Sequence, residues 1–139
     1  MAVLKHFSND VERIFNKVET ISSASTLTEA DSGKWYELNN STGVTVTLPA
    51  VKSGVNFRFV VGAAFATDNF IIDSAEGDNI NGILVVNGAS VSASGEDQIN
   101  FVASAETVGD FIDIWSDGSG WYVWGIGNSA GSITATDPS

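Results

Sequence analysis

Apolar and polar residues alternate with a period of two along most of the chain after residue 26. The alternation is plainest over residues 44–48, 55–61, 98–103 and 110–115. Turns containing Gly, Asn or Asp separate these runs at spacings of about ten residues. The pattern predicts an all-β fold of about eight or nine short strands, arranged as an antiparallel β-sandwich, a jelly-roll-like domain or a barrel.

The most specific turn signal is Asn87-Gly88, which lies between the strand-like runs 83–86 and 89–93. Both residues tolerate the positive φ angles of a two-residue hairpin turn, so we expect a hairpin here. A second turn, at residues 117–120, precedes the strand-like run 121–124.

The first twenty residues have a different pattern, with apolar residues spaced as on one face of a helix. Asn9 and Glu12 are placed as in a capping box. A helix of about ten residues is marginal alone in water, so it must pack against the domain's own core or against a partner protein. As a docking arm, it would contact a shell or a neighbouring copy through five apolar residues: Phe7, Val11, Ile14, Phe15 and Val18.

The composition along the chain predicts three segments. Residues 1–25 form an N-terminal arm with a short amphipathic helix and a Ser-rich connector. Residues 26–127 form the β-rich domain. Residues 128–139 form a Gly-, Ser- and Thr-rich tail that is flexible or bound at an interface.

The net charge of the chain limits which classes of partner it can bind. The 139 residues include 6 Lys and Arg against 17 Asp and Glu, a net charge of −11, and the first twenty residues are neutral overall. So acidic a chain lacks the basic surface that nucleic acids and anionic lipids require. No apolar run approaches the ~20 residues of a membrane helix, and no signal peptide is recognisable, so we expect synthesis in the cytoplasm and no membrane partner.

Residues able to carry out catalysis are scarce. The chain has no Cys and a single His, His6, which lies in the predicted arm. Two carboxylate pairs are candidates for catalysis. Asp110 and Asp113 would face opposite ways and so would not converge, and Glu96 and Asp97 lie in a turn, where acidic residues are common. We therefore expect no enzyme, no catalytic residues and no cofactor.

A metal site is also not predicted. Residues 73–79 carry several oxygen ligands around Gly77, but they lack the spacing of a calcium-binding EF-hand loop. We therefore interpret them as a polar turn.

The aromatic residues allow two interpretations. Four tryptophans could stack on sugars, or they could divide between the core and a subunit interface: Trp35, Trp115, Trp121 and Trp124. We favour the second interpretation, because Trp121 and Trp124 should face opposite sides of one strand, one of them inward and the other toward an interface.

Residues 27–39, Leu-Thr-Glu-Ala-Asp-Ser-Gly-Lys-Trp-Tyr-Glu-Leu-Asn, resemble the opening of small capsid decoration (cement) proteins of tailed phages. The blocks 43–49, 54–61 and 116–125 continue the resemblance, which covers residues 26–127. Similar blocks occur in phage tail-fibre and other virion surface domains.

The resemblance implies a structural protein on the outer surface of an icosahedral phage capsid. Such proteins are β-rich, commonly homotrimeric, and cement neighbouring subunits of the major capsid protein. No catalytic residue belongs to the family pattern. The alternative is a receptor- or glycan-binding module of a tail fibre or head fibre.

Overall fold

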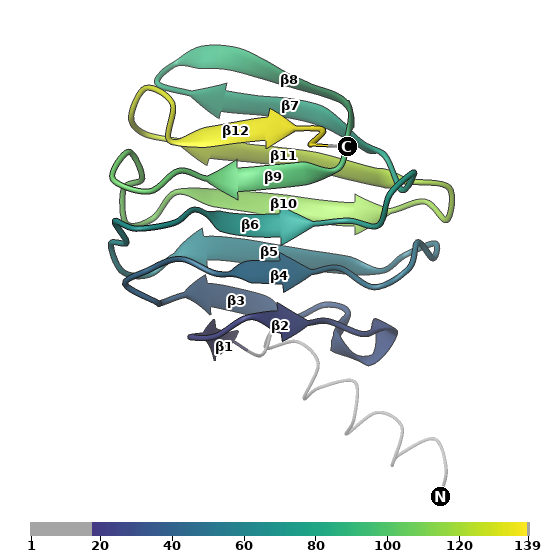
Figure 1. Cartoon of the computed structure of the whole chain (residues 1–139). Coiled ribbons are helices and arrows are strands. Elements are labelled where there is room, and N and C mark those ends of the chain that lie inside the picture. The colour runs from purple at the N-terminus through teal and green to yellow at the C-terminus, as the bar shows by residue number, and fades with distance from the viewer. Residues whose placement is uncertain (1–17, 139) are drawn as a thin grey trace, which may run out of the picture.

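The computed structural model describes residues 18–138 and shows an all-β protein with two stacked sheets (Figure 1). The large sheet contains, in spatial order, β1 (Val18–Ile21), β3 (Trp35–Leu38), β5 (Asn56–Val61), β10 (Phe111–Ser116), β11 (Trp121–Gly127), β7 (Ile80–Val86) and β8 (Ala89–Glu96). The small sheet contains β12 (Ile133–Thr136), β9 (Gln98–Phe101), β6 (Phe70–Asp73), β4 (Thr45–Thr47) and β2 (Ser25–Thr26). A short 3-10 turn, η1 (Glu29–Asp31), precedes β3.

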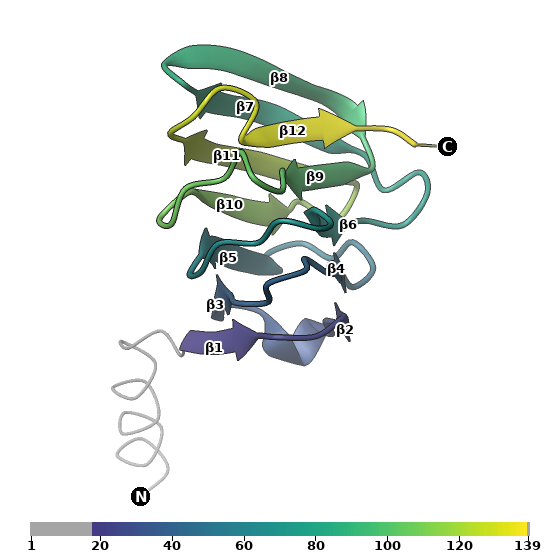
Figure 2. The ribbon, with the colours of Figure 1, turned by 60° about the vertical axis from the view of Figure 1, so that its left-hand side comes forward.

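The predicted all-β sandwich is confirmed, but its sheets are mixed and not purely antiparallel. From β1 to β6 the chain crosses to the other sheet after every strand, as Figure 2 shows. Successive strands of one sheet therefore run in the same direction, so that β1, β3 and β5 pair in parallel, as do β2, β4 and β6. Alternation with a period of two identifies a strand but not its partner strand, which explains why the sequence did not predict the parallel pairing.

The sandwich extends beyond residues 26–127, which were expected to contain it. Strand β1 pairs with β3, β2 pairs with β4, and β12 pairs with β9 near the C-terminus. The prediction that Val18 belongs to a helix is wrong. Val18 begins strand β1 opposite Trp35, and its side chain is 57% exposed. The helix itself and four of its contact residues lie outside the described part of the chain: Phe7, Val11, Ile14 and Phe15.

Both predicted turns are present. Asn87 and Gly88 have φ angles of 51° and 75° and join β7 to β8, which confirms the two-residue hairpin. Between β10 and β11, the Asp117 side chain accepts hydrogen bonds from the backbone N–H groups of Ser119 (2.8 Å) and Gly120 (3.1 Å). These hydrogen bonds lower the pKa of Asp117.

The core lies between the two sheets and is rich in aromatic rings. Phe57 packs against Phe59 and Trp121, with ring centroids 6.2 and 6.4 Å apart. Phe65 and Phe70 meet edge to face at 5.0 Å. Because alternate residues of each strand point into this core, the remaining residues form the two outer faces of the sandwich. Within residues 18–138, no helix has the length and apolar character needed to cross a membrane.

Candidate functional site

The outer face of the large sheet carries aligned rows of side chains. The strand register places Trp35, Arg58, Asp113, Trp124 and Ile83 side by side across β3, β5, β10, β11 and β7. Each lies one position from an inward-facing core residue of its strand, so all five point away from the core. Residues from five segments of the chain thus form one continuous surface.

Two flanking rows extend this surface. Trp115 and Tyr122 lie opposite each other on β10 and β11, with their rings stacked and the centroids 6.1 Å apart. On the other side, Phe111 lies beside Ile126, and Ile126 lies beside Val85. We call these rows together the aromatic face; its apolar members are Trp35, Ile83, Val85, Phe111, Trp115, Tyr122, Trp124 and Ile126.

A single ion pair lies in the middle of the aromatic face. Arg58 donates hydrogen bonds from Nε and Nη2 to both carboxylate oxygens of Asp113, with an Nη2–Oδ2 distance of 2.7 Å. The hydrogen bond to Asp113 raises the pKa of Arg58. The indole N–H of Trp124 also donates to Asp113, at 3.1 Å. The two charges therefore compensate each other locally.

The same ion pair orders the surrounding rings. The Arg58 guanidinium lies 4.7 Å from the centre of the Trp35 ring and 5.6 Å from that of Phe111. Phe111 in turn meets Trp124 edge to face at 5.4 Å. A cation over an aromatic face is attracted by the ring's quadrupole, so these contacts hold the rings in place before any partner binds.

Exposure of this surface indicates an interaction site. Seven of its eight apolar members are exposed, from 38% for Trp35 to 58% for Ile83, and Phe111 is partly buried. Contiguous exposed apolar side chains mark binding surfaces, and Trp, Tyr and Arg are the residues most enriched at the energetic centres of protein interfaces. A shallow hollow of about 240 Å³ lies on this surface, and its lining includes Trp35, Trp115 and the Arg58–Asp113 pair.

The structure separates the four tryptophans as the alternation predicts. Trp35, Trp115 and Trp124 lie on the aromatic face, whereas Trp121 is 1% exposed and belongs to the core. An interface role for Trp121 is therefore not consistent with its burial, and this part of the interface prediction is corrected. Sequence reasoning missed Tyr122 and Arg58, although both hold outward positions in strands that it recognised.

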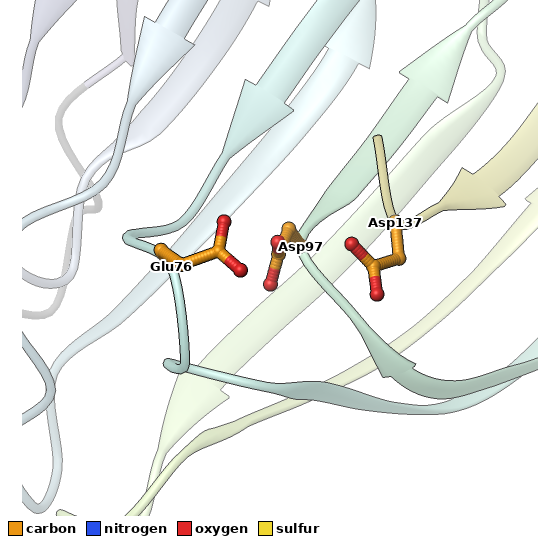
Figure 3. Close-up of side chains that lie close together, drawn as sticks. All are labelled: Glu76, Asp97 and Asp137. Atoms are coloured by element: carbon orange, nitrogen blue, oxygen red, sulfur yellow. The ribbon is translucent and has the colours of Figure 1, made fainter. Parts of the chain in front are cut away.

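The carboxylates considered for catalysis have different surroundings in the structure. Asp110 is 4% exposed and accepts hydrogen bonds from the backbone N–H groups of Thr107 and Asn128, both at 2.9 Å. These bonds hold the loops at that end of β10. Asp113 belongs to the aromatic face. Glu96 ends strand β8, and the carboxylate of Asp97 lies near those of Glu76 and Asp137 (Figure 3).

Comparisons of the chain with family models, curated proteins and solved structures found no match.

Proposed function

We propose that the protein is a structural virion protein that decorates the outer surface of an icosahedral phage capsid and cements neighbouring subunits of the major capsid protein. The resemblance of residues 27–39, 43–49, 54–61 and 116–125 to decoration proteins supplies the class. The aromatic face is the structural observation that carries the proposal, because it gives the domain a preorganised surface for contact with protein.

The aromatic face is proposed to be the contact between copies in a homotrimer. Identical chains with a net charge of −11 repel one another, so they approach most easily where charge is compensated. On the aromatic face the Arg58–Asp113 pair provides that compensation, and aromatic rings supply the contact area. An assembled trimer gains further affinity for a symmetric shell through simultaneous binding at several points.

The N-terminal arm is proposed to bind the shell or a neighbouring copy. The chain enters the sandwich through β1 at the edge of the large sheet, where Val18 pairs with Trp35. The arm therefore joins the domain at the end of the row that crosses the aromatic face. This placement allows the arm and the face to belong to one assembly surface.

Light scattering in solution tests the contact between copies. We expect the wild type to have three times the chain mass of 14.6 kDa. The double variant Trp115→Ser/Tyr122→Ser should be monomeric, because it removes the stacked ring pair. Asn100→Ala is the control, since Asn100 belongs to β9 of the small sheet, on the other side of the core from the aromatic face. A wild-type monomer at high micromolar concentration would contradict the trimer, and a trimeric double variant would contradict the assigned surface.

Binding to undecorated phage shells tests the function itself. The wild type should co-sediment with the shells and saturate at a fixed number of copies per capsid. Deleting residues 2–17 leaves β1 intact, and we expect it to reduce occupancy seen by electron microscopy. Full occupancy by the truncated protein would refute the role of the arm, and absence of wild-type binding would refute decoration.

The hollow on the aromatic face supports a second candidate, a glycan-binding module of a fibre. Trp35 and Trp115 could stack on a sugar ring there, while Arg58, Asp113 and Asn56 provide hydrogen-bonding groups. Titration with glycans while following tryptophan fluorescence distinguishes the two functions. Saturable quenching together with no shell binding would favour the glycan module.

A further inference from the structure

The proposed homotrimer limits what can cover the aromatic face. In a closed ring of three identical chains, each contact joins two different surfaces of the chain, whereas a surface that pairs with itself makes a dimer. A broad sheet face cannot lie wholly on a three-fold axis. The aromatic face therefore needs a different, complementary surface on the neighbouring copy.

The sandwich itself offers no second apolar surface. Among residues 18–138, the exposed large apolar side chains are the seven exposed members of the aromatic face together with Val18 and Val108. Val18 lies at the end of the central row of the face and points to the same side. Val108 lines a hollow of about 400 Å³ together with Phe111 and Ile126, so it borders the face. All of these side chains belong to one region, and the counterpart must come from another part of the chain.

The segment 1–17 carries the missing apolar surface. Four of its apolar residues recur at the spacing of one helix face: Phe7, Val11, Ile14 and Phe15. Amphipathic helices occupy apolar surfaces of partner proteins through anchors at this spacing. A helix over residues 7–17 would be about 16 Å long, and the central row from β3 to β7 crosses four strand spacings, about 19 Å. The segment is therefore long enough to cover most of the face.

Charge favours this segment over the rest of a neighbouring copy. Residues 1–17 contain three basic side chains against two acidic ones, a net charge of +1. Residues 18–139 contain three basic side chains against fifteen acidic ones, a net charge of −12. Two sandwiches therefore repel each other, whereas the N-terminal segment of one copy is attracted to the sandwich of the next.

The point at which the segment joins the sandwich directs it toward a neighbour. Val18 begins β1, an edge strand of the large sheet at the rim of the aromatic face. Only Asn16 and Lys17 separate Phe15 from this edge. Folding back over the same sheet requires the chain to reverse within these two residues, whereas the face of an adjacent copy can be reached without such a reversal.

We propose that residues 1–17 of each copy pack on the aromatic face of the next copy, so that three such contacts close the trimer. The inference rests on the proposed function and selects, of the two partners proposed for the arm, the neighbouring copy. The hollow beside Val108 provides a recess for one of the two Phe side chains of the segment.

Light scattering of full-length variants tests whether the segment closes the trimer. Val11→Ser/Phe15→Ser should be monomeric at concentrations at which the wild type is trimeric, because it removes two apolar anchors. Asn16→Ala is the matched control and should stay trimeric, since residue 16 falls on the opposite side of the predicted helix. Far-UV circular dichroism should show the same β-sandwich in all three proteins. A trimeric double variant would overturn the inference.

Photo-cross-linking identifies the surface that receives the segment. The chain contains no Cys, so Ser8→Cys provides a single site for a benzophenone label beside Phe7. Labelled chains and 15N-enriched wild-type chains are mixed as dilute monomers, concentrated and irradiated, and the linked peptides are identified by mass spectrometry. We expect cross-links between the two isotopes that join the segment to β10, β11 or β7.

The outcomes separate this inference from the proposed function. A trimer without mixed-isotope cross-links places the segment on its own chain, and cross-links to the small sheet place it on another surface; either result overturns the inference and leaves the trimer standing. A wild-type monomer at high micromolar concentration overturns the trimer and the inference together. A trimer with the expected cross-links that does not bind undecorated shells supports the inference and refutes decoration alone.

Discussion

The two outer faces of the sandwich are built by the same alternation but differ in chemistry. The outer face of the small sheet is polar, with Asn100 donating a hydrogen bond to the Thr136 hydroxyl at 2.9 Å and Gln98 donating to Asp73 at 2.8 Å. The outer face of the large sheet carries exposed rings around a single compensated ion pair. Figure 1 shows the two sheets stacked, so the core separates these faces.

The difference shows which face has its side chains satisfied within a single copy of the chain and which face does not. On the small sheet, side-chain donors find acceptors within the sheet, and the remaining polar groups can bind water. On the large sheet, rings such as Trp115 and Trp124 remain 40% and 43% exposed. Burying such rings is favourable, so the large sheet is the face that gains most from a partner.

The largest expected effect contrasts the two sides of strand β11. Trp121→Ala should lower the free energy of unfolding by about 3–5 kcal/mol, because it leaves a cavity beside Phe57. Trp124→Ala, three residues along the same strand, should lower it by no more than about 1 kcal/mol. Urea denaturation followed by circular dichroism measures both. Equal losses would contradict the division of the strand into a core side and a contact side.

A second prediction concerns the polar face of the small sheet. Asn100 is 5% exposed, so Asn100→Ala should cost about 1 kcal/mol by removing its hydrogen bond to Thr136. Self-association, measured by light scattering, should not change. A loss of association without a loss of stability would place the interface on the small sheet.

A third prediction concerns the ion pair of the aromatic face. Asp113→Asn leaves Arg58 without its carboxylate partner, and because the pair is partly exposed we expect a loss of about 0.5–1 kcal/mol. Self-association should weaken more than stability, since each copy would carry an uncompensated positive charge into the contact. Arg58→Lys is an informative companion, because Lys keeps the charge but loses the bidentate geometry.

The smallest expected effect lies in the turn at the end of β10, where Asp117 accepts hydrogen bonds from backbone N–H groups. Backbone N–H groups lower the pKa of Asp117 in the folded protein below its unfolded value of about 3.9, so its charge stabilises the fold above that pH. The contribution is lost as the pH falls through the lowered pKa. Asp117→Asn keeps the acceptor oxygen but removes the charge, so the Tm difference from the wild type should shrink between pH 6 and pH 2.5. A difference independent of pH would contradict this assignment.

Much of the local structure was predictable because it depends on neighbours in the sequence. The Asn87-Gly88 hairpin follows from the φ angles that these two residues tolerate. The opposite orientations of Trp121 and Trp124 follow from the period of two in a strand. Val18 was misassigned because its spacing from Val11, Ile14 and Phe15 suits a helix, whereas pairing with β3 places it in a strand.

The sequence by itself determined that the chain is all-β, which residues of most strands face the core, and that the domain is strongly acidic. Only the tertiary structure decided which strands pair, because pairing depends on contacts between distant segments. That pairing places Trp35, Arg58, Asp113 and Trp124 in one row. It also brings Glu76, Asp97 and Asp137 together at the end of the small sheet, although they are far apart along the chain.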